Sequence, residues 1–382
     1  MGGNLNNSRE LPVRVLCTLA FLGFTFCYLF FFQADLIAME QHVLSGGMTH
    51  YNKTVGAILI TLLLYLLQLF VRRVAQWHGG FYFLTFVPSL LLLIMLTSAD
   101  DTFDIQPFSS VWTWLVPVLL CLYAYFVFFC RKKRIIGLYF GRGEGLFGCL
   151  WQNILCLSLA FLFVCLAGNS NEVLHYRLRM ETLLSDGNYS EALEVGNRSL
   201  ATDESLTMLR IYALSRSKKL GERLFEYPLT GGSEALLPNG KDVKCMIIPN
   251  SDITKFLSVR KKGSMKSMEY LTYLEHNGLA MKSVTDYILC GYLLDRNLDG
   301  FVNVIRRKYN LSSPSLPKHY REALTLYTHL RANPVVVFHS EIMDADYADF
   351  QKLEQSYTVK EQKYSYLKDS YGDTYWFYYF YK

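Results

Sequence analysis

Five long apolar runs alternate with short polar connectors over the first 168 residues of the chain. In chain order the runs cover residues 11–32, 54–71, 80–97, 109–130 and 149–168. Each is of the length that an α-helix needs to cross about 30 Å of hydrocarbon at a rise of about 1.5 Å per residue. We therefore expect an all-α protein in which residues 1–168 form a polytopic helical membrane domain with about five spans.

The first run could instead be the apolar part of a secretory signal peptide. A signal peptide has a shorter apolar region that is followed by a cleavage site of small residues. Here Phe31, Phe32 and Gln33 end the run, and further spans follow it. We interpret residues 11–32 as a retained membrane helix.

From residue 169 onwards, apolar positions recur at the spacing of amphipathic helices. Glu172–Leu184 predicts one helix, Asp186–Asn188 a turn, and a second helix begins at Tyr189 and runs towards Asp203. Further helices are expected over residues 207–217, 220–227, 267–276, 282–294, 301–309 and 320–330. The stretch 229–263 is rich in Gly and Pro, and predicts either a loop with a short strand-like run at 243–248 or an irregular helix pair.

Two stretches of this second half share a pattern of aromatic, small and aliphatic residues that suits paired helices. The expected contact positions are Tyr176, Gly187, Tyr189, Ala192, Leu193 and Leu200 in the first stretch, and Tyr320, Ala323, Leu324 and Tyr327 in the second. Over about 17 residues the first stretch resembles the second half of a tetratricopeptide (TPR) repeat, although Arg179 and Met180 occupy the Leu-Gly positions of that motif. The resemblance implies a TPR-like α-solenoid over residues 169–382, whose stacked helix pairs form a surface for a protein or peptide partner.

Seven consecutive aromatic residues, Tyr375–Tyr381, lie near the end of the sequence. Such a segment needs shelter from water, because burying each ring is worth about 1.5 to 3 kcal/mol. It could cap the last helices of the solenoid or return to the outer face of the membrane, where Tyr and Trp favour the headgroup layer. We favour the cap, because the tyrosine hydroxyls would then find backbone partners.

Charge predicts the orientation of the spans. The net charge is only +5, and Lys and Arg concentrate in alternate connectors. The positive connectors carry Arg9 and Arg14, then Arg72 and Arg73, then Arg131–Arg134 and Arg142, whereas the others carry only Lys53 or the acidic Asp100, Asp101 and Asp104. This asymmetry places the N-terminus in the cytoplasm and, after five spans, residues 169–382 outside it.

The sequence offers no reaction chemistry. No Asp, Glu, Lys, Arg or His lies near the centre of a span, which disfavours a pump or transporter. The glycines of residues 141–145 lack the Gly-Lys-Ser/Thr ending of a phosphate-binding loop, and no other catalytic motif is recognisable. We therefore assign no catalytic, cofactor-binding or metal-binding residue, no cofactor and no nucleic-acid partner. Cys245 and Cys290 could form a disulfide outside the cytoplasm, but sequence gives no geometry for it.

The five spans, the TPR-like half and the ending Tyr371–Trp376 together resemble an uncharacterised family of inner-membrane proteins from Bacteroidetes-type bacteria. The resemblance implies that the second half is periplasmic, and it implies no activity. Two functions remain open for a chain in contact with the lipid bilayer. The first is a protein-interaction or scaffold role at the cell envelope, and the alternative is a membrane enzyme or carrier for a lipid-linked substrate, with the repeats as a recruitment module.

Overall fold

The computed structural model describes residues 3–75, 77, 79–99, 111–132, 146–258 and 264–382. Every regular element in these residues is a helix, which confirms the expected all-α fold class. The chain divides into two compact units, Met1–His175 and Tyr176–Lys382. The division falls inside the helix α8 (Glu172–Ser185), slightly later than the boundary after residue 168 that the sequence suggests.

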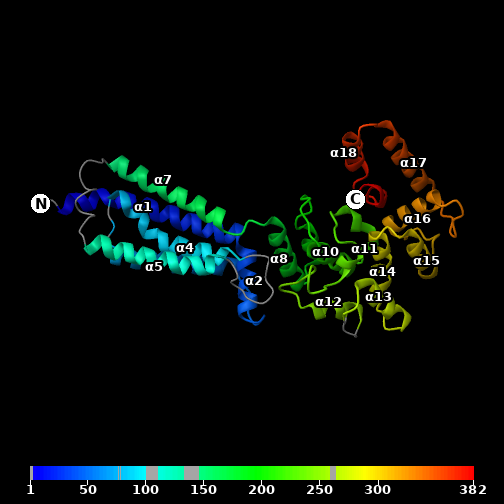
Figure 1. Ribbon diagram of the computed structural model, residues 1–382, viewed down its shortest axis with the longest axis horizontal. Coiled ribbons are helices and arrows are strands. Elements are labelled where there is room, and N and C mark those ends of the chain that lie inside the picture. The colour runs from blue at the N-terminus through cyan, green and yellow to red at the C-terminus, as the bar shows by residue number, and fades with distance from the viewer. Residues whose placement is uncertain (1–2, 76, 78, 100–110, 133–145, 259–263) are drawn as a thin grey trace. The chain divides into compact units, whose positions relative to one another are not determined.

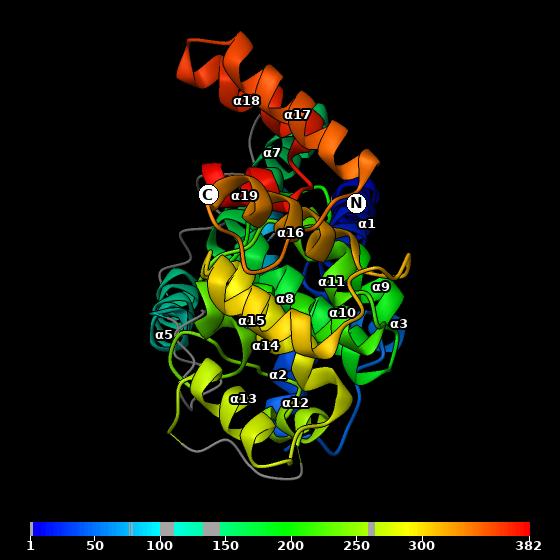
Figure 2. The ribbon, with the colours of Figure 1, turned by 90° about the vertical axis from the view of Figure 1, so that its right-hand side faces the viewer.

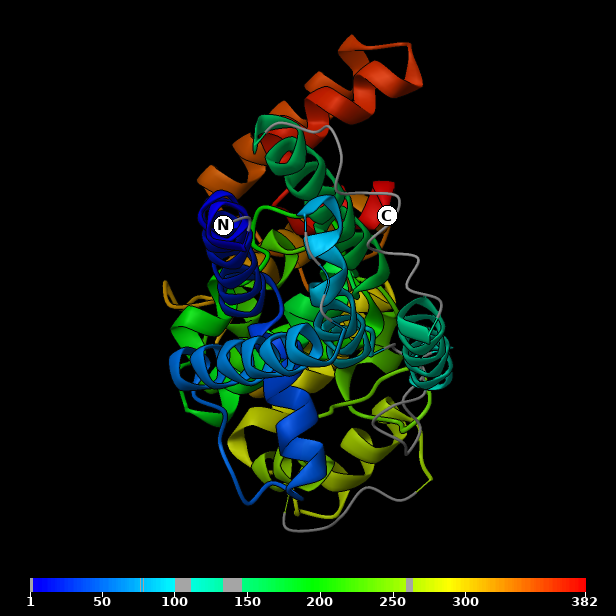
Figure 3. The same cartoon turned by 90° about the vertical axis from the view of Figure 1, so that its left-hand side faces the viewer.

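The first unit contains four helical segments that are long and apolar enough to cross a membrane: Leu11–Phe32, Lys53–Ala75, Val111–Lys132 and Phe147–Ala167. They belong to α1 (Gly3–Cys27) with the π-helical turn η1 (Tyr28–Phe32), α3 (Lys53–Ala75), α5 (Val111–Lys132) and α7 (Leu146–Ala167). Within this unit α1 packs against α7, as Figures 1 and 3 show. The chain is therefore a membrane protein. One further helix, α2 (Ala34–Leu44), lies in a stretch for which the sequence predicts only a connector.

The third predicted span is not a single α-helix. Its first part is a 3₁₀ helix, η2 (Gly79–Phe86), and its second part is the short α-helix α4 (Val87–Thr97). Pro88 explains the change, because proline has no N–H for the carbonyl four residues earlier. That carbonyl belongs to Leu84, and it accepts a hydrogen bond of 2.9 Å from the hydroxyl of Tyr123 in α5 instead.

Together η2 and α4 nevertheless extend along most of α7. Near one end, the backbone N–H of Phe83 donates to Asn153 of α7. Beyond the other end of α7, the backbone N–H of Asn169 donates to the carbonyl of Thr97 at 2.6 Å. Because a 3₁₀ helix rises about 2.0 Å per residue, the two segments span about 32 Å, close to the thickness of a hydrocarbon core.

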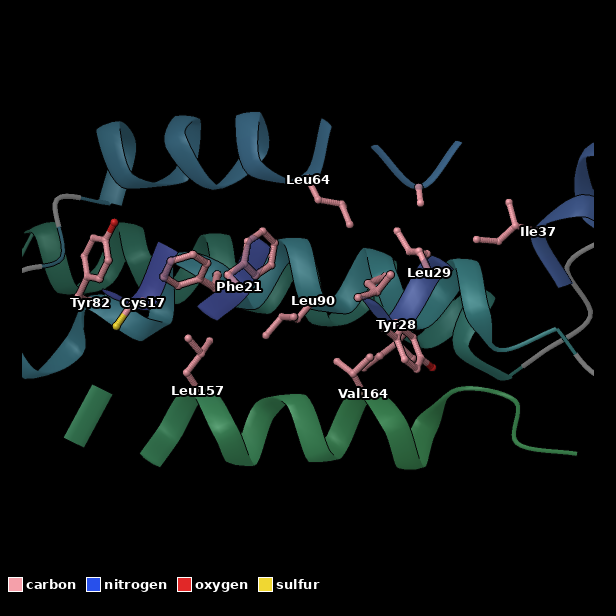
Figure 4. Packing of buried hydrophobic residues seen from close by; sticks show 14 of the residues in the cluster. Cys17, Phe21, Tyr28, Leu29, Ile37, Leu64, Tyr82, Leu90, Leu157 and Val164 are labelled. Atoms are coloured by element: carbon pink, nitrogen blue, oxygen red, sulfur yellow. The ribbon is translucent and has the colours of Figure 1, made fainter. Parts of the chain in front are cut away.

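The core of the first unit joins side chains from α1, α3, η2, α4 and α7 (Figure 4). Phe21 and Phe86 are fully buried with their ring centroids 5.0 Å apart. The helix α7 contributes Leu157 and, beside Tyr28, Val164 to the same core. Water cannot drive helix association inside lipid, so this close packing and a few polar contacts hold the helices together.

The second unit is a succession of helices after α8. They are α9 (Tyr189–Glu194), α10 (Glu204–Arg216), α11 (Leu220–Arg223), η3 (Leu224–Glu226), η4 (Gly232–Leu236), α12 (Asn250–Leu257), α13 (Ser267–His276), α14 (Lys282–Leu294), α15 (Leu298–Lys308), α16 (Lys318–Leu330), α17 (Glu341–Ser356), α18 (Lys360–Tyr371) and α19 (Tyr375–Tyr381). From α13 to α18 most helices pack against the next one along the chain, and Figure 2 shows this for α13 to α16. The bounds of α13 and α14 coincide with those predicted from the sequence.

The helix α10 lies at the centre of this unit. All its positions from Ser205 to Ser215 are buried, whereas an amphipathic helix would leave one face in water. Even Arg210 is buried, and its guanidinium donates to the carbonyl of Pro228 at 3.0 Å. Burial lowers the pKa of Arg210 to about 10.

The stretch 229–263 contains no strand in its described residues, and the run 243–248 forms a series of bends between η4 and α12. The expected strand-like run is therefore wrong, and the irregular helical alternative is closer to the structure.

Candidate functional site

The first group of expected contact residues separates in the structure. Ala192 and Leu193 are buried in α9, and Gly187 has φ +79° in the turn before it. Leu200, by contrast, is 68% exposed. The reason is that α9 ends at Glu194: the next residue is extended and Gly196 adopts φ +62°, so Leu200 lies beyond the helix and cannot pair with another one.

The two aromatic residues of this group have different surroundings. Tyr176 is half-buried, and a Cβ atom at Gly196 would lie 2.8 Å from its ring, so a glycine is needed at this close approach. Tyr189 is also half-buried, and its hydroxyl accepts a hydrogen bond of 2.5 Å from Arg216.

The second group lies together on α16. Tyr320, Ala323, Leu324 and Tyr327 are all buried. The hydroxyl of Tyr320 donates to the Oδ1 atom of Asp286 in α14 at 2.9 Å, and the hydroxyl of Tyr309 donates to the same atom at 2.6 Å. This face therefore fixes α16 against its neighbours.

A buried carboxylate on α16 holds the aromatic C-terminal helix. The Oε2 atom of Glu322 accepts a hydrogen bond of 2.7 Å from the backbone N–H of Tyr375, and the Glu322 carbonyl accepts one of 2.8 Å from the indole of Trp376. His319 lies 2.9 Å from the same carboxylate through Nδ1, while its Nε2 accepts from the backbone N–H of Phe225. The aromatic segment thus packs as a cap on α16, as we predicted.

A second buried carboxylate holds the irregular stretch before α12. The Oε2 atom of Glu181 in α8 accepts from three successive backbone N–H groups, those of Met246, Ile247 and Ile248, at 2.8, 2.6 and 3.1 Å. Burial raises the pKa of Glu181, and the three N–H donors and Arg177 oppose that effect. A single acid therefore replaces the ladder of hydrogen bonds that a strand would have made.

That stretch forms one wall of a pocket in the second unit. The pocket has a volume of about 450 Å³, within the range of about 300 to 1,000 Å³ that is typical of ligand sites. It is lined by Leu184, Ser185, Tyr212, Arg216, Ile248, Pro249, Asp252, Lys255 and Phe256. Charged, aromatic and aliphatic side chains thus meet in one hollow.

Arg216 is the central side chain of this pocket. It is exposed, and its guanidinium carbon lies 4.9 Å from the ring centroid of Tyr189 and 5.0 Å from that of Phe256. The Tyr212 ring is 5.9 Å away. Among the described residues no carboxylate pairs with Arg216, whereas Lys255 pairs with Asp252 at 3.1 Å. The three rings hold the guanidinium in place and leave its charge open to a ligand.

A separate polar cluster lies inside the membrane unit beside η2. The side-chain amide of Gln68 in α3 donates to the hydroxyl of Thr85 at 2.9 Å, and Asn153 of α7 accepts from the backbone N–H of Phe83 at 2.7 Å. Both amides are fully buried. Asn153 thus satisfies a backbone N–H of η2, and Gln68 holds the side-chain hydroxyl of Thr85. In a membrane, irregular backbone needs such partners within the protein. The sequence signal for this cluster is an amide side chain, Gln68 or Asn153, within an otherwise apolar run, whereas a charged residue would have been the more obvious one.

Several residues that the sequence suggests for a disulfide, a metal site or a phosphate site form no such site in the described structure. Cys245 and Cys290 are both free thiols. Within the described part of the chain, no group of three or more His, Cys, Asp or Glu side chains is arranged so that it could hold a metal ion. The acidic residues Asp100, Asp101 and Asp104, the cations at 133, 134 and 142, and the glycines of 141–145 lie outside the described residues.

Comparison with known families adds one finding. Residues 260–382 match a family of unknown function, DUF6057. The matched stretch contains α13 to α19, and thus the His319–Glu322 pair with the helix it holds. No curated protein and no solved structure matches the chain. Because the family has no assigned function, the match transfers no activity.

Proposed function

We propose that this protein is a membrane-anchored, TPR-like helical scaffold whose C-terminal unit binds a protein or peptide partner. The observation that carries the proposal is the pocket around Arg216, where a cation without a carboxylate partner lies among three aromatic rings, two of which line the pocket beside aliphatic side chains. Aromatic residues and arginine dominate the binding energy of protein interfaces. A pocket that combines them suits the recognition of a protein or peptide.

We further propose that the C-terminal unit is periplasmic, in a bacterial inner membrane of the Bacteroidetes type. Five crossings are needed for that placement when the N-terminus is cytoplasmic. The length of η2 and α4 along α7 supports the fifth crossing, and the distribution of Lys and Arg supports the direction.

The test uses site-specific photo-crosslinking in native membranes. A photo-reactive amino acid in place of Lys255, at the rim of the pocket, is expected to capture a discrete partner protein. The substitution Arg216→Met in the same chain should abolish that capture, because the hydrophobic contacts remain but the guanidinium is lost.

The matched control is the same photo-reactive residue at Glu361, an exposed position on α18 away from the pocket lining. Capture at both positions, or capture that survives Arg216→Met, would contradict the assigned binding site.

A second candidate function is a membrane enzyme or carrier that acts on a lipid-linked substrate and uses the C-terminal unit for recruitment. It is favoured by the Oε1 atom of Gln68, a buried acceptor with no donor among the described residues of the membrane unit. Under this candidate, Gln68→Leu should remove a lipid-linked product from membrane extracts and leave crosslinking at residue 255 unchanged. Under the scaffold proposal, the lipid profile should not change.

A further inference from the structure

A groove of about 290 Å³ opens on the surface of the membrane unit between α3 and α5. Its lining is almost wholly apolar: Phe70, Val71, Val74, Ala75, Pro88, Leu120, Tyr123, Ala124, Val127, Phe128 and Arg131. The depth has a simple origin. Ala75 and Ala124 contribute only methyl groups, whereas Phe70 and Phe128 beside them are about two-thirds exposed and form the walls.

The groove has one charged residue, Arg131, near the end of α5. Its guanidinium donates a hydrogen bond of 2.9 Å to the carbonyl of Val74, in the last turn of α3. The last four carbonyls of a helix lack partners within the helix, so this bond satisfies one of them and ties α5 to α3. Among the described residues it is the one hydrogen bond that Arg131 makes, and the other N–H groups remain for a second acceptor.

Further positive charge lies at the same end of the two helices. Arg72 and Arg73 occupy the last turn of α3, as Arg131 and Lys132 do in α5. An apolar groove beside a cluster of cations is complementary to a hydrocarbon chain attached to an anionic headgroup. Helices of this length and composition are surrounded by such molecules in a membrane.

We propose that the groove is a binding site for one anionic glycerophospholipid. One acyl chain lies over Ala75 and Ala124, between the exposed rings, and the phosphate accepts hydrogen bonds from the free N–H groups of Arg131. The bound lipid covers apolar surface that the protein itself leaves open, and it bridges α3 and α5 where α4 begins at Val87. This proposal does not depend on the function of the C-terminal unit.

The test is native mass spectrometry of the full-length protein released from detergent, with added phosphatidylglycerol or phosphatidylcholine. The wild-type protein is expected to retain one phosphatidylglycerol and to release phosphatidylcholine. Arg131→Gln should weaken phosphatidylglycerol binding by about tenfold, the loss expected for one charge-assisted hydrogen bond. Ala124→Phe should fill the groove and abolish binding.

Two matched variants serve as controls. Lys53→Gln removes a cation at the opposite end of α3, and Leu122→Phe enlarges an exposed side chain of α5, yet neither residue lines the groove or belongs to the cation cluster at its end. Both should retain phosphatidylglycerol as the wild type does. The proposal would be overturned if Arg131→Gln and Ala124→Phe retained phosphatidylglycerol as well as the wild type does. It would also be overturned if the wild type retained phosphatidylcholine as well as phosphatidylglycerol, or retained neither lipid. If Ala124→Phe does not fold, comparison of Arg131→Gln with Lys53→Gln still decides between the outcomes.

Discussion

The backbone N–H of Tyr375 donates a hydrogen bond of 2.7 Å to the buried side-chain carboxylate of Glu322, fifty-three positions earlier in the chain. This contact fixes the start of the aromatic helix α19 on α16. The shelter matters, because seven neighbouring aromatic rings left exposed to water would form an apolar patch that favours aggregation.

Glu322→Leu should therefore loosen the C-terminal cap. The change leaves the N–H of Tyr375 and the Nδ1 of His319 without an acceptor in a buried site, and each unsatisfied group costs about 1 to 3 kcal/mol. We expect a lower thermal midpoint of the full-length protein in detergent and faster release of α19 by limited proteolysis. Glu361→Leu, at an exposed position of α18, is the control and should change neither measurement. Identical proteolysis of both variants would show that Glu322 does not hold the helix.

Ala192→Leu should destabilise the C-terminal unit by about 1 to 3 kcal/mol, because Ala192 is fully buried where α9 meets α10 and a larger side chain would overpack the contact. Ser190→Leu, at an exposed position of the same helix, should leave the stability of the unit nearly unchanged. The measurement is the thermal midpoint of the two full-length variants side by side. Equal midpoints would mean that α9 is not packed as described.

Asn153→Leu should destabilise the membrane unit. The N–H of Phe83 in η2 would lose its acceptor, and interhelical hydrogen bonds in membranes are worth about 0.6 to 1.7 kcal/mol. Gln152→Leu removes an amide from the adjacent, half-buried position and serves as the control. Comparison of the two unfolding midpoints in detergent tests the role of Asn153, and a larger effect of Gln152→Leu would argue against it.

Glu181 predicts a pH dependence of stability. Burial raises the pKa of the Glu181 carboxyl in the folded state, so the folded protein binds this proton more tightly than the unfolded chain does. Its contribution to stability is therefore fully present below the unfolded pKa and is lost as the pH rises through the folded pKa. The thermal midpoint of the wild type, relative to that of Glu181→Gln, should therefore fall as the pH rises above the unfolded pKa of about 4.3. A constant or rising difference would show that the three N–H donors and Arg177 outweigh the burial.

The proposed orientation predicts a labelling pattern in spheroplasts, for a chain whose native cysteines are replaced. A membrane-impermeant thiol reagent should modify a cysteine at Ser170 and should not reach one at Lys132. The reverse pattern would place the C-terminal unit in the cytoplasm, as four crossings rather than five would do.

The sequence by itself determined the features that depend on local composition and periodicity. Uninterrupted apolar runs must avoid water, so the membrane helices are visible without coordinates. Helices such as Ser267–His276 and Lys282–Leu294 are equally predictable, because their apolar positions follow the helical repeat and turn residues bound them.

Only the tertiary structure decided which groups form hydrogen bonds with the backbone where it departs from a regular helix. Pro88 is visible in the sequence, but the donor that replaces its missing N–H is Tyr123, on another helix. The bends at 246–248 are stable because Glu181 reaches them from α8, and Leu200 is exposed because α9 ends early. Such contacts join residues that are far apart in the chain, and no local pattern encodes which distant side chain will supply a hydrogen bond.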